Sequence, residues 1–130
     1  MIEEQYVSFE TAKLAKEKGF DEEFENMHVW NNFKGEILED VSGYNMKNSH
    51  LCKNSYSAPT QSLLARWLRE VHNMCVEVYS TGYGFIWCIC DTDSGSFSNE
   101  TGSNDAGAWD TYEGAMEAGL QEALELVKSW

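Results

Sequence analysis

Cysteines are the first residues to consider for chemistry in this sequence, because of their type and spacing. Of the four, Cys75, Cys88 and Cys90 fall within a predicted hairpin, and His72 stands just before it. Zinc takes four nitrogen or sulfur ligands in a tetrahedron, so this set could serve as its ligands. The spacing lacks the C-x-x-C pattern, and half-buried free thiols are the common alternative. We therefore predict no metal and no other cofactor, with zinc at these residues as the open alternative.

Other patterns typical of metal sites and enzymes are incomplete. The segment Asp91-Thr92-Asp93-Ser94-Gly95 begins like a calcium-binding loop, but Gly95 and Ser96 stand where that loop needs an oxygen ligand and a glycine. A solvated turn is the alternative for this segment. No nucleophile elbow, Walker loop, His-Glu-x-x-His motif or dinucleotide fingerprint occurs. We therefore expect no catalytic residues and a protein that is not an enzyme.

Acidic residues dominate the composition and are unevenly distributed. The 130 residues include 22 acidic and 9 basic side chains, for a formal net charge of −13. Only Lys128 among the basic residues follows Arg69. An acidic field repels the phosphates of nucleic acids and attracts basic proteins. We expect no direct binding to nucleic acid and a partner protein with a basic surface. The alternative is that the charge only keeps the protein in solution.

Four aromatic residues outside the predicted helix stripes also point to an interface, because tyrosine and tryptophan are enriched in binding hot spots: Trp30, Tyr83, Trp109 and Trp130. Trp109 ends a long polar segment, and Trp130 is the last residue. Packing against the domain is the alternative for both. The predicted binding site joins Trp109, as the anchor, to four neighbouring acids: Asp105, Asp110, Glu113 and Glu117.

The elements that must position these residues include three helices. Ser8 can cap a helix over residues 8–18, Gly19 supplies its left-handed end, and Phe20 can fold back onto the last turn. Pro59 suits the first turn of a second helix that begins near residues 57–60. Its apolar stripe comprises Leu64, Trp67, Leu68 and Val71. The third helix runs from Asp110 or Thr111 to about Val127, with the stripe Met116, Leu120, Ala123, Leu124 and Val127, and Gly119 beside it indicates close packing on a sheet.

Short strands are expected over residues 24–30 and 36–40, and loops over 41–57 and 91–109. The clearest hairpin joins residues 74–79 to 83–91 across a two-residue Thr81-Gly82 turn. The expected cross-strand pairs are Ser80 with Tyr83, Val78 with Phe85, Val76 with Trp87, Met74 with Ile89, Glu77 with Ile86 and Cys75 with Cys88. The last pair could form a disulfide on air oxidation, but not in a reducing cytosol.

Together these elements predict an α+β fold in which a small antiparallel sheet is packed by about three helices, in a single domain over residues 1–130. No apolar run approaches the roughly 20 residues of a membrane span, so no membrane contact is expected. The first residues lack the basic-then-apolar pattern of a signal peptide. We therefore expect a cytoplasmic protein with reduced cysteines. A homo-oligomer is compatible with these features.

Three segments together resemble a family of small uncharacterised proteins encoded by gut bacteria of the Bacteroidales group and by their phages and prophages. The segments are VSFETAKLAKEKGF at residues 7–20, APTQSLLARWLRE at residues 58–70 and TYEGAMEAGLQEAL at residues 111–124. The family usually has glutamate in place of Gly114, so the capping box with Thr111 is incomplete here. The resemblance implies a genetic context and no known active site.

What the resemblance implies for function is a phage- or prophage-associated, non-catalytic interaction protein. By analogy with small acidic phage proteins, it would inhibit a host defence protein through its acidic surface. The alternative is a protein that binds or sequesters a nucleotide signal, with aromatic rings stacking on the base. Its phosphate contacts would come from Lys47, Lys53, Arg66 and Arg69. A third interpretation is a virion or housekeeping component without an inhibitory role.

Overall fold

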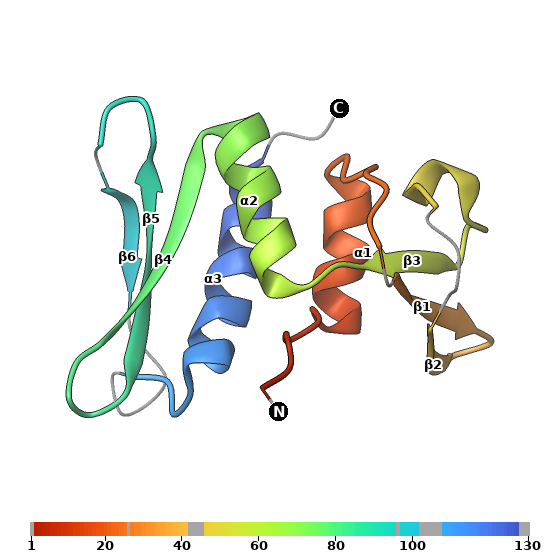
Figure 1. The fold of residues 1–130 in the computed structure, drawn as a ribbon, viewed down its shortest axis with the longest axis horizontal. Coiled ribbons are helices and arrows are strands. Elements are labelled where there is room, and N and C mark those ends of the chain that lie inside the picture. Colours follow the sequence, from red (N-terminus) through yellow and green to blue (C-terminus); the bar gives the residue numbers. More distant parts are fainter. Residues whose placement is uncertain (1, 26, 42–45, 96, 102–107, 128–130) are drawn as a thin grey trace. The chain divides into compact units, whose positions relative to one another are not determined.

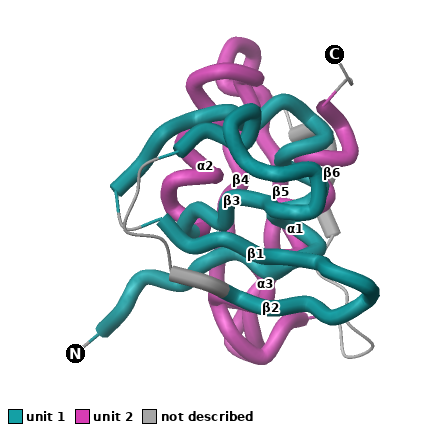
Figure 2. The backbone as a smooth tube through the Cα atoms, turned by 90° about the vertical axis from the view of Figure 1, so that its right-hand side faces the viewer, with its two compact units in different colours: residues 1–60, 128–130 teal, residues 61–127 magenta. Residues whose placement is uncertain are grey.

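The computed structural model describes residues 2–25, 27–41, 46–95, 97–101 and 108–127 (Figure 1). The chain forms two compact units, coloured separately in Figure 2: unit 1 comprises the described residues up to Thr60, and unit 2 comprises Gln61–Val127. The elements of unit 1 are α1 (Phe9–Glu17), β1 (His28–Phe33), β2 (Glu36–Val41), the 3-10 helix η1 (Asn48–His50) and β3 (Ser55–Ala58). Those of unit 2 are α2 (Gln61–His72), β4 (Met74–Ser80), β5 (Phe85–Asp91), β6 (Phe97–Thr101) and α3 (Tyr112–Leu126).

Helix α1 begins and ends within one residue of its predicted bounds. The Ser8 hydroxyl accepts a hydrogen bond from the Thr11 N–H at 3.3 Å and so satisfies one amide of the first turn. Gly19 has a φ of +96°, and the Phe20 N–H donates to the Ala15 carbonyl at 2.9 Å. Because Phe20 is buried, the end of α1 folds back as predicted.

Unit 1 contains a three-stranded antiparallel sheet in the order β2-β1-β3. Lys34 and Gly35, both with positive φ, form the two-residue turn between β1 and β2. The prediction of loop over residues 41–57 is wrong where η1 and β3 form, and the second helix begins at Gln61, just after the predicted start at residues 57–60. The sequence does not predict β3, because two of its buried residues are Ser55 and Ser57 and the apolar alternation of a strand is therefore missing.

One buried polar side chain, Asn48, ties separate segments of unit 1 together. Its amide donates to the Phe20 carbonyl at 2.7 Å, and its carbonyl oxygen accepts from the Ser57 N–H at 2.8 Å. Two backbone groups from the end of α1 and from β3 thereby find partners away from water. Asn48 therefore holds η1 against both.

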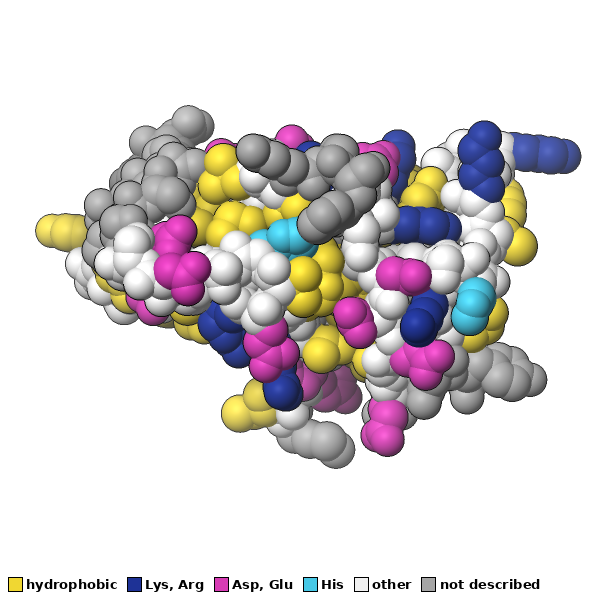
Figure 3. All heavy atoms as spheres, turned by 90° about the horizontal axis from the view of Figure 1, so that it is seen from above, with side chains coloured by type: hydrophobic (Ala, Val, Ile, Leu, Met, Phe, Trp, Pro, Cys, Tyr) yellow, Lys and Arg dark blue, Asp and Glu magenta, His cyan; other side chains and the backbone are white. Residues whose placement is uncertain are grey.

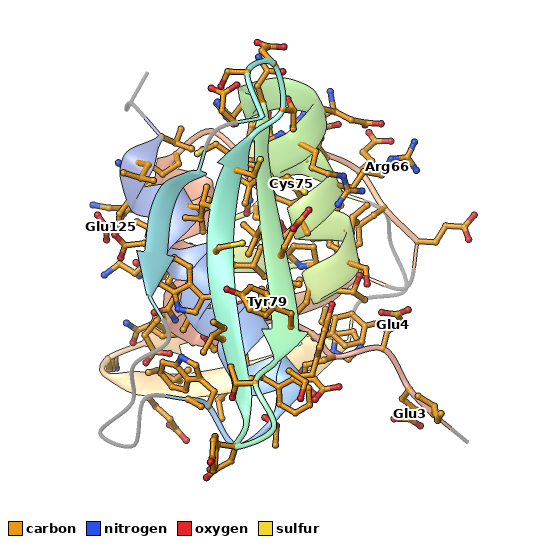
Figure 4. All side chains as sticks on the ribbon, turned by 90° about the vertical axis from the view of Figure 1, so that its left-hand side faces the viewer. Glu3, Glu4, Arg66, Cys75, Tyr79 and Glu125 are labelled. Carbon is orange, nitrogen blue, oxygen red and sulfur yellow. The ribbon has the colours of Figure 1, made fainter. Side chains whose placement is uncertain are left out.

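Unit 2 contains a second three-stranded antiparallel sheet, in the order β4-β5-β6, with α2 and α3 packed behind it in Figure 4. Its core joins buried residues of sheet and helices: Val76, Trp87, Ile89, Leu64, Leu68, Met116, Leu120 and Leu124. A Cβ atom at Gly119 would lie 2.8 Å from Val76 Cγ1, which confirms the predicted close packing. Val71, predicted in the buried stripe of α2, is instead 52% exposed in the last turn of the helix.

The register of the central hairpin differs from the prediction by two residues. Residues 81–84 form a four-residue loop, closed by a hydrogen bond from the Thr81 N–H to the Gly84 carbonyl at 2.9 Å. Ser80 therefore pairs with Phe85, and Cys75 pairs with Cys90 rather than with Cys88. Because side chains alternate with a period of two, this shift changes every pair but leaves each side chain on its predicted face.

The polar segment 91–109 is not a loop throughout, because residues Phe97–Thr101 form β6 and pair with β5. The sequence Phe-Ser-Asn-Glu-Thr lacks the apolar alternation by which strands are recognised. Pairing with the central strand β5 therefore creates a strand that local propensity does not predict.

The predicted α+β class is confirmed: the described residues form three α-helices and two antiparallel sheets. The strands form two sheets rather than one because β1 pairs with β2 and β3, whereas β5 pairs with β4 and β6. The single-domain organisation stays a prediction. Across the part of the chain that the structure describes, no helix is both long enough and apolar enough to cross a bilayer.

Candidate functional site

The predicted binding residues that the structure describes lie at the start of α3. Thr111 caps this helix, because its hydroxyl accepts a hydrogen bond from the Gly114 N–H at 2.9 Å. Asp110 and Glu113 are exposed on either side of the cap, and Glu117 is half-buried one turn further along. Asp105, the fourth predicted acid, lies outside the described residues. The structure therefore brings three of the four carboxylates to the first half of α3.

Trp109, the predicted anchor, is held by its backbone. It forms an isolated antiparallel bridge with Phe85, whose N–H donates to the Trp109 carbonyl at 2.8 Å, and the Trp109 N–H donates back at 2.7 Å. The ring is half-buried, and its buried Nε1 atom has no hydrogen-bond partner among the described residues. These contacts attach the start of α3 to β5. A role for Trp109 as a binding anchor stays a prediction.

Two exposed tyrosines, one at the start of α3 and one in the loop that contacts it, are absent from the predicted site. Tyr83, in the loop 81–84, is 94% exposed, and Tyr112, the first residue of α3, is 43% exposed. The loop and the helix start are in contact, because a Cβ atom at Gly84 would lie 2.5 Å from the Trp109 carbonyl oxygen. The signal for Tyr83 is the one that the sequence offers, an aromatic residue outside the helix stripes, and the structure places it in a surface loop between Gly82 and Gly84.

The charges of unit 2 are almost all negative. Residues 61–127 contain eleven acids and only two basic residues, Arg66 and Arg69. The Arg66 Nε atom forms an ion pair with the Glu70 carboxylate at 3.1 Å. The Glu117 carboxylate accepts a hydrogen bond from the Gln61 side chain at 2.9 Å. No ion pair reaches Asp110 or Glu113 within the described residues.

Among the described residues, Asp110 and Glu113 are therefore exposed carboxylates with no ion-pair partner, and both can meet a cation from another molecule. Glu125, at the far end of α3, projects outward in Figure 4. Figure 3, a view from above, shows that both acidic and basic side chains reach the surface on that side of the molecule.

We define the acidic tyrosine surface as Tyr83, Asp110, Tyr112 and Glu113.

The groups weighed as metal sites are not assembled. Within the described ranges, no group of three or more His, Cys, Asp or Glu residues could hold an ion. The calcium-like segment is a turn in which the Asp91 carboxylate accepts hydrogen bonds from the N–H groups of Asp93 at 2.8 Å and Ser94 at 3.1 Å. The Asp91 carboxylate therefore accepts hydrogen bonds from the backbone, as in an Asx turn.

The four basic residues considered for phosphate binding fall in different units. Lys47 and Lys53 belong to unit 1, whereas Arg66 and Arg69 belong to unit 2. Among the described residues of unit 1, Lys16 is held by two hydrogen bonds. Its Nζ donates to the carbonyls of Ser55 at 2.8 Å and Cys52 at 3.1 Å.

The same ammonium lies 5.2 Å from the centre of the Tyr56 ring, and burial lowers the pKa of Lys16. Its contacts are structural, so this cation is already used within the fold.

No protein-family model, curated protein or solved structure matches this chain. The residues of the acidic tyrosine surface therefore provide the evidence for function.

Proposed function

We propose that this protein is a non-catalytic interaction protein that binds a basic segment of a partner protein through the acidic tyrosine surface. The observation that supports the proposal most directly is the exposure of Tyr83, Tyr112, Asp110 and Glu113 on two segments that the Phe85–Trp109 bridge joins. A surface that combines exposed tyrosines and exposed carboxylates is suited to arginine and lysine.

The chemistry of recognition follows from these side chains. A guanidinium can form paired hydrogen bonds with a carboxylate and can also stack on a tyrosine ring. The excess of negative charge in unit 2 would speed the encounter with such a segment and make it depend on salt. A nucleic acid would be repelled by the same charges.

The biological setting belongs to the same proposal. The resemblance of three segments to proteins of Bacteroidales bacteria and their phages supports a phage or prophage origin and a host protein as the partner. Inhibition of a host defence protein in the cytoplasm is the role we propose for the complex.

The test is capture of a partner by the tagged full-length chain from nuclease-treated Bacteroidales lysate, followed by measurement of the dissociation constant. We expect one stoichiometric basic protein that is released at high salt. Tyr83→Ala should weaken binding about tenfold or more, as truncation of a hot-spot aromatic does. The double variant Asp110→Asn/Glu113→Gln should weaken binding and reduce its salt dependence.

The matched control is Glu125→Gln, which removes one exposed carboxylate from the far end of the same helix. Its affinity should equal that of the parent chain. Unchanged affinity in both the Tyr83 variant and the double variant would contradict the proposal. Excess absorbance at 260 nm from the denatured supernatant of the purified protein would favour the nucleotide-binding alternative instead.

A further inference from the structure

Cys75 and Cys90 are direct partners across the antiparallel strands β4 and β5. Both thiols are partly exposed. They lie on the face opposite to Val76, whose side chain meets α3 at Gly119, so they lie on the side of the sheet away from the helices. In Figure 4, where α2 and α3 lie behind the sheet, Cys75 and Tyr79 are labelled along β4. The two thiols thus share an open face of the sheet.

The Cα separation expected for this cross-strand pair falls within the range found in disulfides. Hydrogen bonds close the hairpin at both ends, from Thr81 N–H to the Gly84 carbonyl and from Thr92 N–H to the Asn73 carbonyl, each at 2.9 Å. Because hydrogen-bonded pairs alternate along an antiparallel ladder, the Cys75–Cys90 pair is hydrogen-bonded too, with Cα atoms about 5.5 Å apart. That distance is the most common one in disulfides.

At present each thiol points to a different acceptor. Cys75 Sγ lies 3.7 Å from the Glu77 carboxylate, and Cys90 Sγ lies 3.6 Å from the Asp91 carbonyl oxygen. The Cβ atoms of a hydrogen-bonded pair lie about 5.5 Å apart, whereas a disulfide needs about 3.5 to 4.5 Å. Closure therefore requires rotation about each Cα–Cβ bond together with a local approach of the two strands. Cys88 is excluded as the partner of Cys75, because it lies diagonally, about 7 to 8 Å away.

We propose that Cys75 and Cys90 form a covalent-modification site, a dithiol that closes to a disulfide by exchange with a low-molecular-weight disulfide such as oxidised glutathione. One protein thiolate attacks the small disulfide, breaks its S–S bond and releases one reduced thiol. The second protein thiolate then attacks the protein sulfur of the mixed disulfide and releases the other thiol. Two protein S–H bonds and one small disulfide become one protein disulfide and two small thiols, and the leaving thiolates take up the two protons.

The charges around Cys75 control how fast this exchange proceeds. Burial, then the Glu77 carboxylate, raise the pKa of the Cys75 thiol, with a smaller contribution from Cys90, whereas Arg69 of α2 lowers it. A raised pKa leaves little thiolate at neutral pH, so exchange should accelerate as the pH is raised. Removal of the Glu77 charge should accelerate it as well.

The experiment incubates the folded full-length protein with oxidised glutathione at mildly alkaline pH, alkylates the remaining thiols and maps the peptides by mass spectrometry. We expect a linked Cys75–Cys90 peptide pair that has lost two hydrogen atoms. Cys88→Ser and Cys52→Ser should retain this link. Glu77→Gln should form it several-fold faster than the parent chain at neutral pH.

Cys75→Ser and Cys90→Ser provide the matched controls, since each leaves one reactive partner alone. Each should stop at the mixed disulfide with glutathione, while circular dichroism shows an unchanged fold. A link from Cys75 to Cys88, a glutathione adduct that persists on Cys75 or Cys90 in the parent chain, or no reaction at alkaline pH would each overturn the proposal.

Discussion

Gly119 of α3 lies directly against Val76 of β4, and a Cβ atom at the glycine would come within 2.8 Å of Val76 Cγ1. The same added atom would lie 3.1 Å from Trp87 Cβ. Both neighbours are buried, so neither can move aside freely. The absence of a side chain at this position therefore sets how closely α3 packs on the sheet.

Two glycines in this helix should respond oppositely to the same substitution. Gly119→Ala gains about 1 kcal/mol in helix propensity but overpacks the core by about 1 to 3 kcal/mol, so we expect a net loss of stability. At Gly114 the added atom would meet chiefly the Thr111 hydroxyl, at 3.0 Å, which lies on the exposed first turn. Gly114→Ala should therefore be neutral or stabilising by up to about 1 kcal/mol.

Urea unfolding of the two variants beside the parent chain measures both effects. If Gly119→Ala proved as stable as the parent chain, the close packing of α3 on β4 would be wrong.

Asn48 should be the most sensitive polar residue of unit 1. Asn48→Ala leaves the Phe20 carbonyl and the Ser57 N–H buried without their present partners, so we expect a loss of about 2 to 4 kcal/mol. Asn54→Ala is the matched control, because Asn54 is exposed in the neighbouring turn. Equal unfolding free energies for the two variants would contradict the role assigned to Asn48.

The parts of the fold that the sequence predicts are those whose local signals agree with burial. Ser8, Gly19 and Phe20 mark both ends of α1, and the apolar stripe of α3 is buried as expected. Strands β3 and β6 are not predictable in this way, because pairing with β1 and β5 holds them in place rather than their own propensity.

In the candidate site, too, some residues follow from local sequence signals and others depend on contacts between distant segments. Asp110 and Glu113 follow from their positions around the cap at Thr111, which local spacing predicts. The contact between the loop 81–84 and the start of α3 depends on the bridge between Phe85 and Trp109. Such a contact between distant segments leaves no local pattern, so the sequence indicates Tyr83 as an interface aromatic but does not group it with the start of α3.

His72 should make stability depend on pH. Its ring lies edge-on against Trp67, with centroids 4.7 Å apart, and burial lowers the pKa of the imidazole below 6.5. As the pH falls below that value, the unfolded chain takes up a proton before the folded chain does, so the free energy of unfolding decreases. His72→Phe keeps an aromatic ring against Trp67 but cannot titrate, and should therefore flatten this decrease.

Urea unfolding at several pH values from about 7.5 down to 5 measures the slope. His50→Gln, at an exposed histidine, is the control and should retain the slope of the parent chain. The same slope in the His72 variant as in the parent chain would show that burial of this imidazole does not govern the pH dependence.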